Sequence, residues 1–309
     1  MKEFFNIVFS VGFGYSILRV TTPILFAALG ALISDKAGVI NIALEGIMLI
    51  CALTGVVFSA LTGSVWIGLL SAIIMGGLIG IVLAYFSLNL RTDIILAGIA
   101  LNLMAGGGTI FFLYLIAKDK GISTSLKSGV LPKITIPLIN KIPVLGPILS
   151  GHNVLTYVSL IAVAAVSYFL YKTPLGLRIR SVGENPDAAA SVGVNVIKIK
   201  YIALALSGVF AGLGGAYMSM GYVSWFSKNM TAGRGFIALA AEAMGAGTPI
   251  GTFLTSLLFG FADSLSNSLQ SLKVPAEFVQ MIPYVATIVG LVIYATRKSA
   301  QVKKVRREN

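Results

Sequence analysis

The sequence predicts an all-α membrane protein, a polytopic bundle of about nine transmembrane helices that forms one domain over residues 1–309. Hydrophobic residues make up 57% of the chain and charged residues 11%, with a mean hydropathy of +0.92, whereas soluble domains carry roughly 25% charged residues. Apolar runs of about 20 residues, long enough to cross a bilayer as a helix, recur along the chain. Strict alternation of apolar and polar residues is absent, which argues against a transmembrane barrel.

The apolar runs give the expected spans in order. They lie at 15–33, 39–61, 65–88, 94–117, 151–171, 201–221, 234–248, 251–270 and 279–296. The run at 234–248 is short and bounded by glycines, so we expect a helix there that is tilted, broken or incompletely crossing. The expected total is therefore about eight to ten spans.

Basic residues predict the orientation of these spans. The net charge is +12, and Lys and Arg of membrane proteins gather in cytoplasmic loops. Segment 172–200 and the C-terminal tail are both basic and are expected in the cytoplasm, which puts the loop 118–150 and the N-terminus outside. That outer loop nevertheless contains five lysines. It is either a solvated loop whose charge did not decide the topology or a docking surface for an acidic partner. Aromatic-rich basic patches are missing, so the charge is not interpreted as nucleic-acid binding.

A polar stretch, GENPDAAASVGVNVIKIK, interrupts the apolar chain from Gly183 to Lys200. Asn185 is a favoured N-cap, Pro186 suits the first helical position, and Asp187 suits the positive end of the helix dipole. Three alanines follow, and Gly193 is expected to end the helix. The predicted helix is about seven residues long, too short to cross a membrane or to be stable alone. It is either an element that docks in a groove of another protein or a simple polar connector.

This stretch resembles the cytoplasmic coupling segment of permease subunits of ABC importers, in the group that serves ribose-type sugars, branched-chain amino acids and nucleosides. Two further stretches agree in the same order. AGVINIALEGIMLI, residues 37–50, resembles the signature of the first membrane helices, and GRGFIALAAEAMGAGTPIGTFLTSLLFGFADSL, residues 233–265, resembles the later glycine-rich pair of spans. The NIALEG and GRGFIALAAE forms look most like nucleoside-type permeases. Glu242-Ala243 departs from the family pattern, which more commonly shows apolar residues there.

The resemblance implies a transmembrane permease subunit that moves nucleosides across the bacterial cytoplasmic membrane by alternating access. It implies separate ATPase subunits that use ATP and Mg, a second permease chain that is a paralogue, and an extracytoplasmic substrate-binding lipoprotein or protein. No cofactor is expected in this chain. The alternative within the class is a simple-sugar permease of the ribose or galactose type. The residues expected to couple to the ATPase are Gly183, Glu184, Asn185, Pro186, Asp187, Ala188, Ala189 and Gly193.

Polar residues inside apolar spans need a reason, because a carboxylate at the centre of a span costs about 2.5–3.5 kcal/mol on insertion scales. Glu45 is expected near the cytoplasmic end of its span, on the same helical face as Asn41. Ser256, Asp263, Asn267 and Gln270 fall on one helical stripe. The stripe is either hydrogen-bonded contact between helices or part of a wet substrate path. The candidate path residues are Asn41, Glu45, Asn102, Phe236, Glu242, Asp263 and Asn267.

The sequence also lacks the motifs of nucleotide-binding proteins and of enzymes. It contains no GxxxxGK[ST] motif and no HExxH motif, and it has one cysteine and one histidine, so neither ATP binding through a P-loop nor an enzyme is expected. An ion-coupled secondary transporter that uses Glu242 or Asp263 is a different class, and inverted repeats would favour it. The only internal similarity, between NIALEG and FIALAAEAMG, is too short to count as a repeat. A pure membrane scaffold is the third class.

Overall fold

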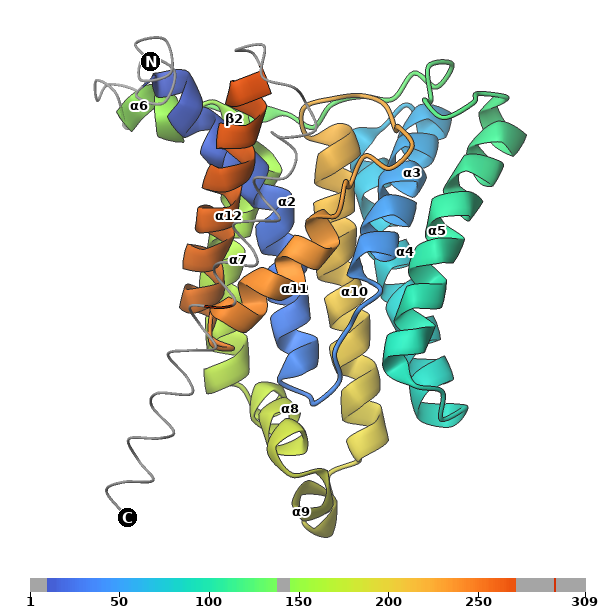
Figure 1. The fold of residues 1–309 in the computed structure, drawn as a ribbon, viewed down its shortest axis with the longest axis vertical. Helices are drawn as coiled ribbons and strands as arrows, with labels where there is room; N and C mark the ends of the chain where they lie inside the picture. The colour runs from blue at the N-terminus through green and yellow to red at the C-terminus, as the bar shows by residue number, and fades with distance from the viewer. Residues whose placement is uncertain (1–9, 138–144, 271–291, 293–309) are drawn as a thin grey trace.

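The computed structural model describes residues 10–137, 145–270 and 292, and within them the chain is almost entirely helical (Figure 1). Six helical segments are long and apolar enough to cross a membrane, which confirms the predicted all-α membrane bundle. They are α2 (Val11–Asp35), α3 (Leu44–Thr62), α4 (Val65–Ala84) continued by η1 (Tyr85–Asn89), α5 (Ile94–Ala117), α7 (Val154–Lys172) and α10 (Val196–Met220). The predicted span at 279–296 lies outside the described residues.

Helix α10 packs closely against α4, because glycines face each other where the two helices cross. A Cβ atom added to Gly208 would lie 2.9 Å from the carbonyl carbon of Gly76, and one added to Gly76 would lie 3.1 Å from the Cα atom of Gly212. Small residues spaced four apart allow such close approach of backbones in membranes. Gly208 and Gly212 therefore allow α10 to pack closely against α4.

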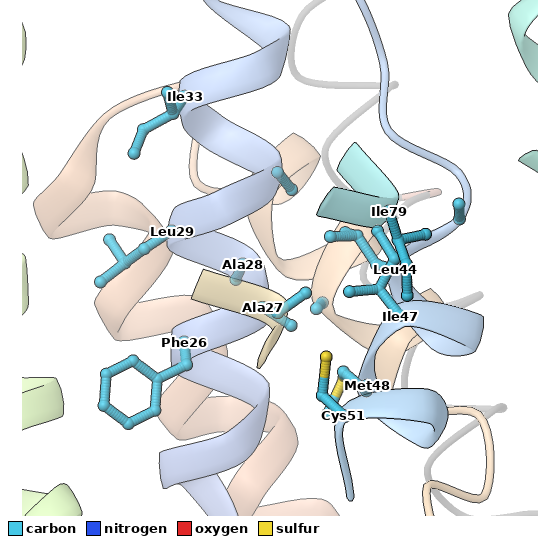
Figure 2. Close-up of a cluster of buried hydrophobic side chains, with 14 of the residues drawn as sticks. Phe26, Ala27, Ala28, Leu29, Ile33, Leu44, Ile47, Met48, Cys51 and Ile79 are labelled. Carbon is cyan, nitrogen blue, oxygen red and sulfur yellow. The ribbon is translucent and has the colours of Figure 1, made fainter. Parts of the chain in front are cut away.

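The core is apolar and lies where α2, α3, α4 and α10 meet. Figure 2 shows part of it, with side chains of α2 beside those of α3 and α4. The labelled side chains are Phe26, Ala27, Ala28, Leu29 and Ile33 of α2, Leu44, Ile47, Met48 and Cys51 of α3, and Ile79 of α4. Cys51 is a free, buried thiol, and in this core it packs as a small hydrophobic residue.

Two elements begin inside the bundle rather than at its ends. Helix α3 starts at Leu44, after a non-helical segment at 36–43, and α11 (Arg234–Met244) follows a non-helical segment at 221–233. Figure 1 shows both helices starting partway along the height of the bundle. The prediction of a helical span from residue 39 was wrong by five residues. Helix α11 has 11 residues and is about 16 Å long, so it does not cross by itself, as its flanking glycines suggested.

Helix α12 (Pro249–Gln270) follows α11 after a short turn and packs against α11 and α2. The predicted span at 251–270 agrees with it. Its N-terminal turn is tied to α11, because the Thr255 hydroxyl donates to the Ala241 carbonyl oxygen at 2.5 Å. The pair α11 and α12 therefore forms a helical hairpin on one side of the bundle (Figure 1).

The loop between α5 and α7 contains only short elements in its described part. Strands β1 (Lys133–Ile134) and β2 (His152–Asn153) pair in antiparallel fashion, and α6 (Leu145–Leu149) precedes β2. The His152 ring stacks on Tyr15 of α2 at 3.9 Å between centroids. At the start of the loop, hydrogen bonds from the hydroxyl and N–H of Ser125 hold the pKa of the Asp119 carboxyl below its usual value.

Candidate functional site

Glu45 joins the first turns of α3 and α11. Its Oε1 atom accepts a hydrogen bond from the Gly233 N–H at 2.8 Å, and its Oε2 atom accepts one from the Gly235 N–H at 2.7 Å. The first N–H groups of a helix lack partners within the helix, and negative charge is favourable at that end. A carboxylate in the first turn of α3 therefore caps the N-terminus of α11. We call Glu45 together with the first turns of α3 and α11 the helix junction.

Asn102 and Asn41 satisfy the backbone around the interruption that precedes α3. The Asn102 side chain donates to the Ile42 carbonyl oxygen at 2.9 Å and accepts from the Gly46 N–H at 2.7 Å. The Asn41 side chain donates to the Ser207 hydroxyl oxygen at 2.9 Å and accepts from the Ala43 N–H at 3.1 Å. Irregular backbone at membrane depth is tolerated only where its polar groups find partners in the protein.

One expectation about these residues was wrong. Asn41 precedes α3, so it does not share a helical face with Glu45. This difference follows from the late start of α3, which the apolar sequence at 39–43 did not reveal. Glu45 lies in the first turn of α3, at the end of the helix where it was expected, and it contacts the N-terminus of α11.

Arg234 and Asp263 form an ion pair that fixes α11 to α12. The Arg234 Nη2 atom lies 2.8 Å from the Asp263 Oδ2 atom, and the side chains are 15% and 13% exposed. Ionisable residues inside membrane domains usually pair with one another, and Asp263 has its partner one residue into α11. The sequence analysis selected Asp263 but did not name Arg234 as its partner. The available signal was that Arg234 stands directly before the apolar run of α11, where a charge needs a counter-charge.

The remaining predicted path residues lie in different surroundings. Phe236 of α11 and Asn267 of α12 are exposed, whereas Glu242 is buried. Glu242 lies near the charges of Asp35 and Lys36 at the end of α2. On the predicted stripe, Ser256 and Asp263 are buried and Asn267 is exposed; the side chain of Gln270 lies outside the described residues. The stripe therefore spans both the interior and the surface of the bundle.

The polar stretch folds as its capping residues predicted. Asn185 caps α9 (Pro186–Ser191) by accepting from the Ala188 N–H at 3.0 Å. Gly193 ends the turn with a φ of 82°, and Ala189 is the only residue of α9 that is buried. Figure 1 shows α9 protruding from the end of the bundle. The helix has 6 residues, close to the expected length.

The sequence analysis missed the helix that carries α9. Helix α8 (Pro174–Glu184) is capped by Thr173, whose hydroxyl oxygen accepts from the Gly176 N–H at 3.1 Å. The Thr-Pro pair was an available start signal, since Thr is an N-cap residue and Pro favours the first helical position. Helix α8 lies against the end of α2. A polar cavity of about 280 Å³ lies beside this contact and is lined by Asp35, Lys36, Tyr171, Arg180, Gly183 and Glu184.

This architecture, with interrupted helices inside a multi-pass bundle and a capped helix protruding from one end, defines a membrane permease. Residues 15–295 match the family described as branched-chain amino acid transport system / permease component. The chain belongs to this family.

Similar proteins agree with this assignment. The nucleoside ABC transporter permease protein NupC of Lactococcus lactis is 38% identical over 90% of both chains. The guanosine ABC transporter permease protein NupQ of Bacillus subtilis is 40% identical, also over 90% of both chains. The solved structure of PsaBC from Streptococcus pneumoniae in complex with Fab has the same fold, with a TM-score of 0.52 and 16% identity over 98% of this chain and 99% of that chain.

Proposed function

We propose that the chain is the membrane-spanning permease subunit of an ATP-driven importer of nucleosides. The observation that carries the proposal is the similarity to NupC and NupQ, which extends over nine-tenths of each chain. The aligned region includes both α9 and the helix junction. The substrate class comes from the names of these relatives, and the geometry supplies the parts that such a subunit needs.

The protruding helix α9 is the proposed contact for the ATPase. Exposed Ala188, the N-cap Asn185 and Asp187 in the first turn form a small, polar end of α9 that suits a groove on another protein. The ATPase subunits use ATP and Mg, and their closure moves α9. In the orientation that the basic segments predict, α9 lies in the cytoplasm. The loop between α5 and α7 then faces outside, where a substrate-binding lipoprotein or protein delivers cargo.

A second permease chain of the same family completes the proposed pore. Of the candidate spans in the described part of the chain, α5 is the least covered by the rest of the protein. Only 22% of its most apolar 18-residue stretch is buried. Its exposed side chains are apolar, and they suit either lipid or another membrane chain. We propose that this partner is a paralogue, and that the assembly lies in the bacterial cytoplasmic membrane.

The proposed path runs past the helix junction. Asn41, Glu45 and Asn102 hold the interrupted backbone in place, and Arg234 with Asp263 fixes α11 to α12. Phe236 and Asn267 are exposed and are the residues that we assign to contact with cargo. An aromatic ring offers a surface for base stacking, and an amide offers hydrogen bonds. Glu242 is assigned to the end of the path nearer α9, because it lies close to Asp35 and Lys36.

The test is uptake into proteoliposomes that contain the permease, its second permease chain and the ATPase. Guanosine, uridine, ribose and galactose are offered with the binding protein, with and without internal ATP. Nucleoside uptake that requires ATP and survives collapse of ion gradients supports the proposal. Uptake of sugars alone, or uptake that stops when the ion gradients collapse, would reject it.

A further inference from the structure

The backbone of α8 touches the backbone of the turn that ends α2. A Cβ atom added to Gly183 would lie 2.9 Å from the Lys36 carbonyl carbon and 3.1 Å from the Gly38 nitrogen. A Cβ atom added to Gly38 would lie 3.3 Å from the Gly183 Cα atom. Real Cβ atoms rarely approach other atoms so closely, so Gly183 has no room for a side chain, and Gly38, which also has a positive φ, has little. The segment that carries α9 is therefore in direct contact with the segment that leads into α3.

The turn at the end of α2 is held in one shape. Gly38 has a φ of 71°, its N–H donates to the Asp35 carbonyl oxygen at 2.8 Å, and the Val39 N–H donates to the Ser34 carbonyl oxygen at 3.1 Å. A left-handed glycine closed by such hydrogen bonds is a common helix C-terminus. The turn therefore moves with its neighbours more readily than it deforms.

The segment from this turn to Glu45 is short and well bonded. Asn41 and Asn102 hold it to α10 and α5 through the hydrogen bonds described above. Glu45 follows directly and carries the N-terminus of α11. A continuous series of backbone and hydrogen-bond contacts thus leads from Gly183, through segment 36–43, to the helix junction.

We propose that Gly183 and Gly38 are positioning residues for transport: their contact passes the displacement of α8 and α9 to segment 36–43 and so to the helix junction. The proposal rests on the proposed function, because it assigns the point at which ATPase motion enters the membrane helices. Movement of segment 36–43 shifts Glu45 relative to Gly233 and Gly235, which changes how α11 lies beside α3.

The first experiment substitutes Gly183→Ala in the reconstituted complex, with Gly12→Ala as the matched control. Both glycines are helical, and a Cβ atom added to Gly12 would meet only the Ser10 Oγ atom, at an ordinary contact distance of 3.8 Å. Ala forms helices better than Gly, so any loss at 183 comes from the contact and not from the helix. We expect uptake per ATP hydrolysed to fall about tenfold in Gly183→Ala, within the usual range for coupling between two sites. The ATPase rate and the uptake of the Gly12→Ala complex are expected to stay unchanged. Unchanged uptake per ATP in an assembled Gly183→Ala complex would overturn the proposal.

The second experiment needs no substitution and covers the case in which Gly183→Ala does not assemble. Amide deuterium exchange is measured in the unmodified complex with and without ATP, under conditions that block hydrolysis. The proposal expects α9, segment 36–43 and residues 233–235 to change their exchange together. A change at α9 with constant exchange at 36–43 would overturn it. This measurement requires no cargo, so it distinguishes failure of the contact from failure of the nucleoside assignment, which the uptake of the unmodified complex decides.

Discussion

Replacing Glu45 by glutamine should strongly destabilise the helix junction, although the two side chains have nearly the same shape. The carboxylate accepts two hydrogen bonds, one on each oxygen, from the N–H groups of Gly233 and Gly235. Glutamine has one oxygen and one NH₂ group, and the NH₂ group cannot accept. One N–H group therefore loses its partner and faces another donor.

The cost follows from the two hydrogen bonds and the charge. A hydrogen bond to a charged group contributes about 1.5–3 kcal/mol, and a neutral one about 1 kcal/mol. The lost negative charge at two helix N-termini adds roughly 0.3–1 kcal/mol for each helix end. We therefore expect Glu45→Gln to reduce the stability of the complex by about 3 kcal/mol.

The matched control is Asp93→Asn. Asp93 also accepts from two backbone N–H groups at a helix N-terminus, those of Ile95 at 2.8 Å and Leu96 at 3.1 Å, but it is exposed. Asn is as good an N-cap as Asp, so this change should leave stability within about 0.5 kcal/mol. Thermal denaturation of the purified complex, followed by size-exclusion chromatography with fluorescence detection, measures both variants. Equal melting temperatures for Glu45→Gln and Asp93→Asn would refute the role of Glu45 as the acceptor that joins α3 to α11.

Three further predictions concern other parts of the chain. Asp263→Asn should lower stability by about 3 kcal/mol, because it leaves the Arg234 charge inside the bundle without its counter-charge; an unchanged melting temperature would contradict the assigned ion pair. Ala188→Asp should leave the protein inserted but abolish ATP-driven uptake, because burying a charge at this exposed position of α9 opposes docking; full uptake by an assembled complex would exclude α9 as the ATPase contact. A cysteine introduced as Ser191→Cys should be shielded from impermeant thiol reagents added to intact cells, whereas Ser128→Cys should react; the opposite pattern would reverse the proposed orientation.

The sequence was sufficient to predict those elements whose ends are set by neighbouring residues. Helix α9 begins at Asn185 and ends before Gly193 because the side chain of one and the backbone freedom of the other act within one turn. The long span α5 agrees with prediction because a continuous apolar run of about 20 residues has a single favourable state in a bilayer. Composition alone therefore determined the fold class.

The helix junction depended on contacts that no local pattern records. Residues 39–43 read as a continuation of the apolar run that follows. The hydrogen bonds of the Asn102 and Asn41 side chains show why the backbone can remain irregular there. In the same way, Glu45 finds its donors nearly 190 positions away in sequence, at Gly233 and Gly235. A bilayer offers no water to satisfy an interrupted backbone. The interruption is therefore stable only where distant segments supply its hydrogen bonds, and that supply is decided by the tertiary structure.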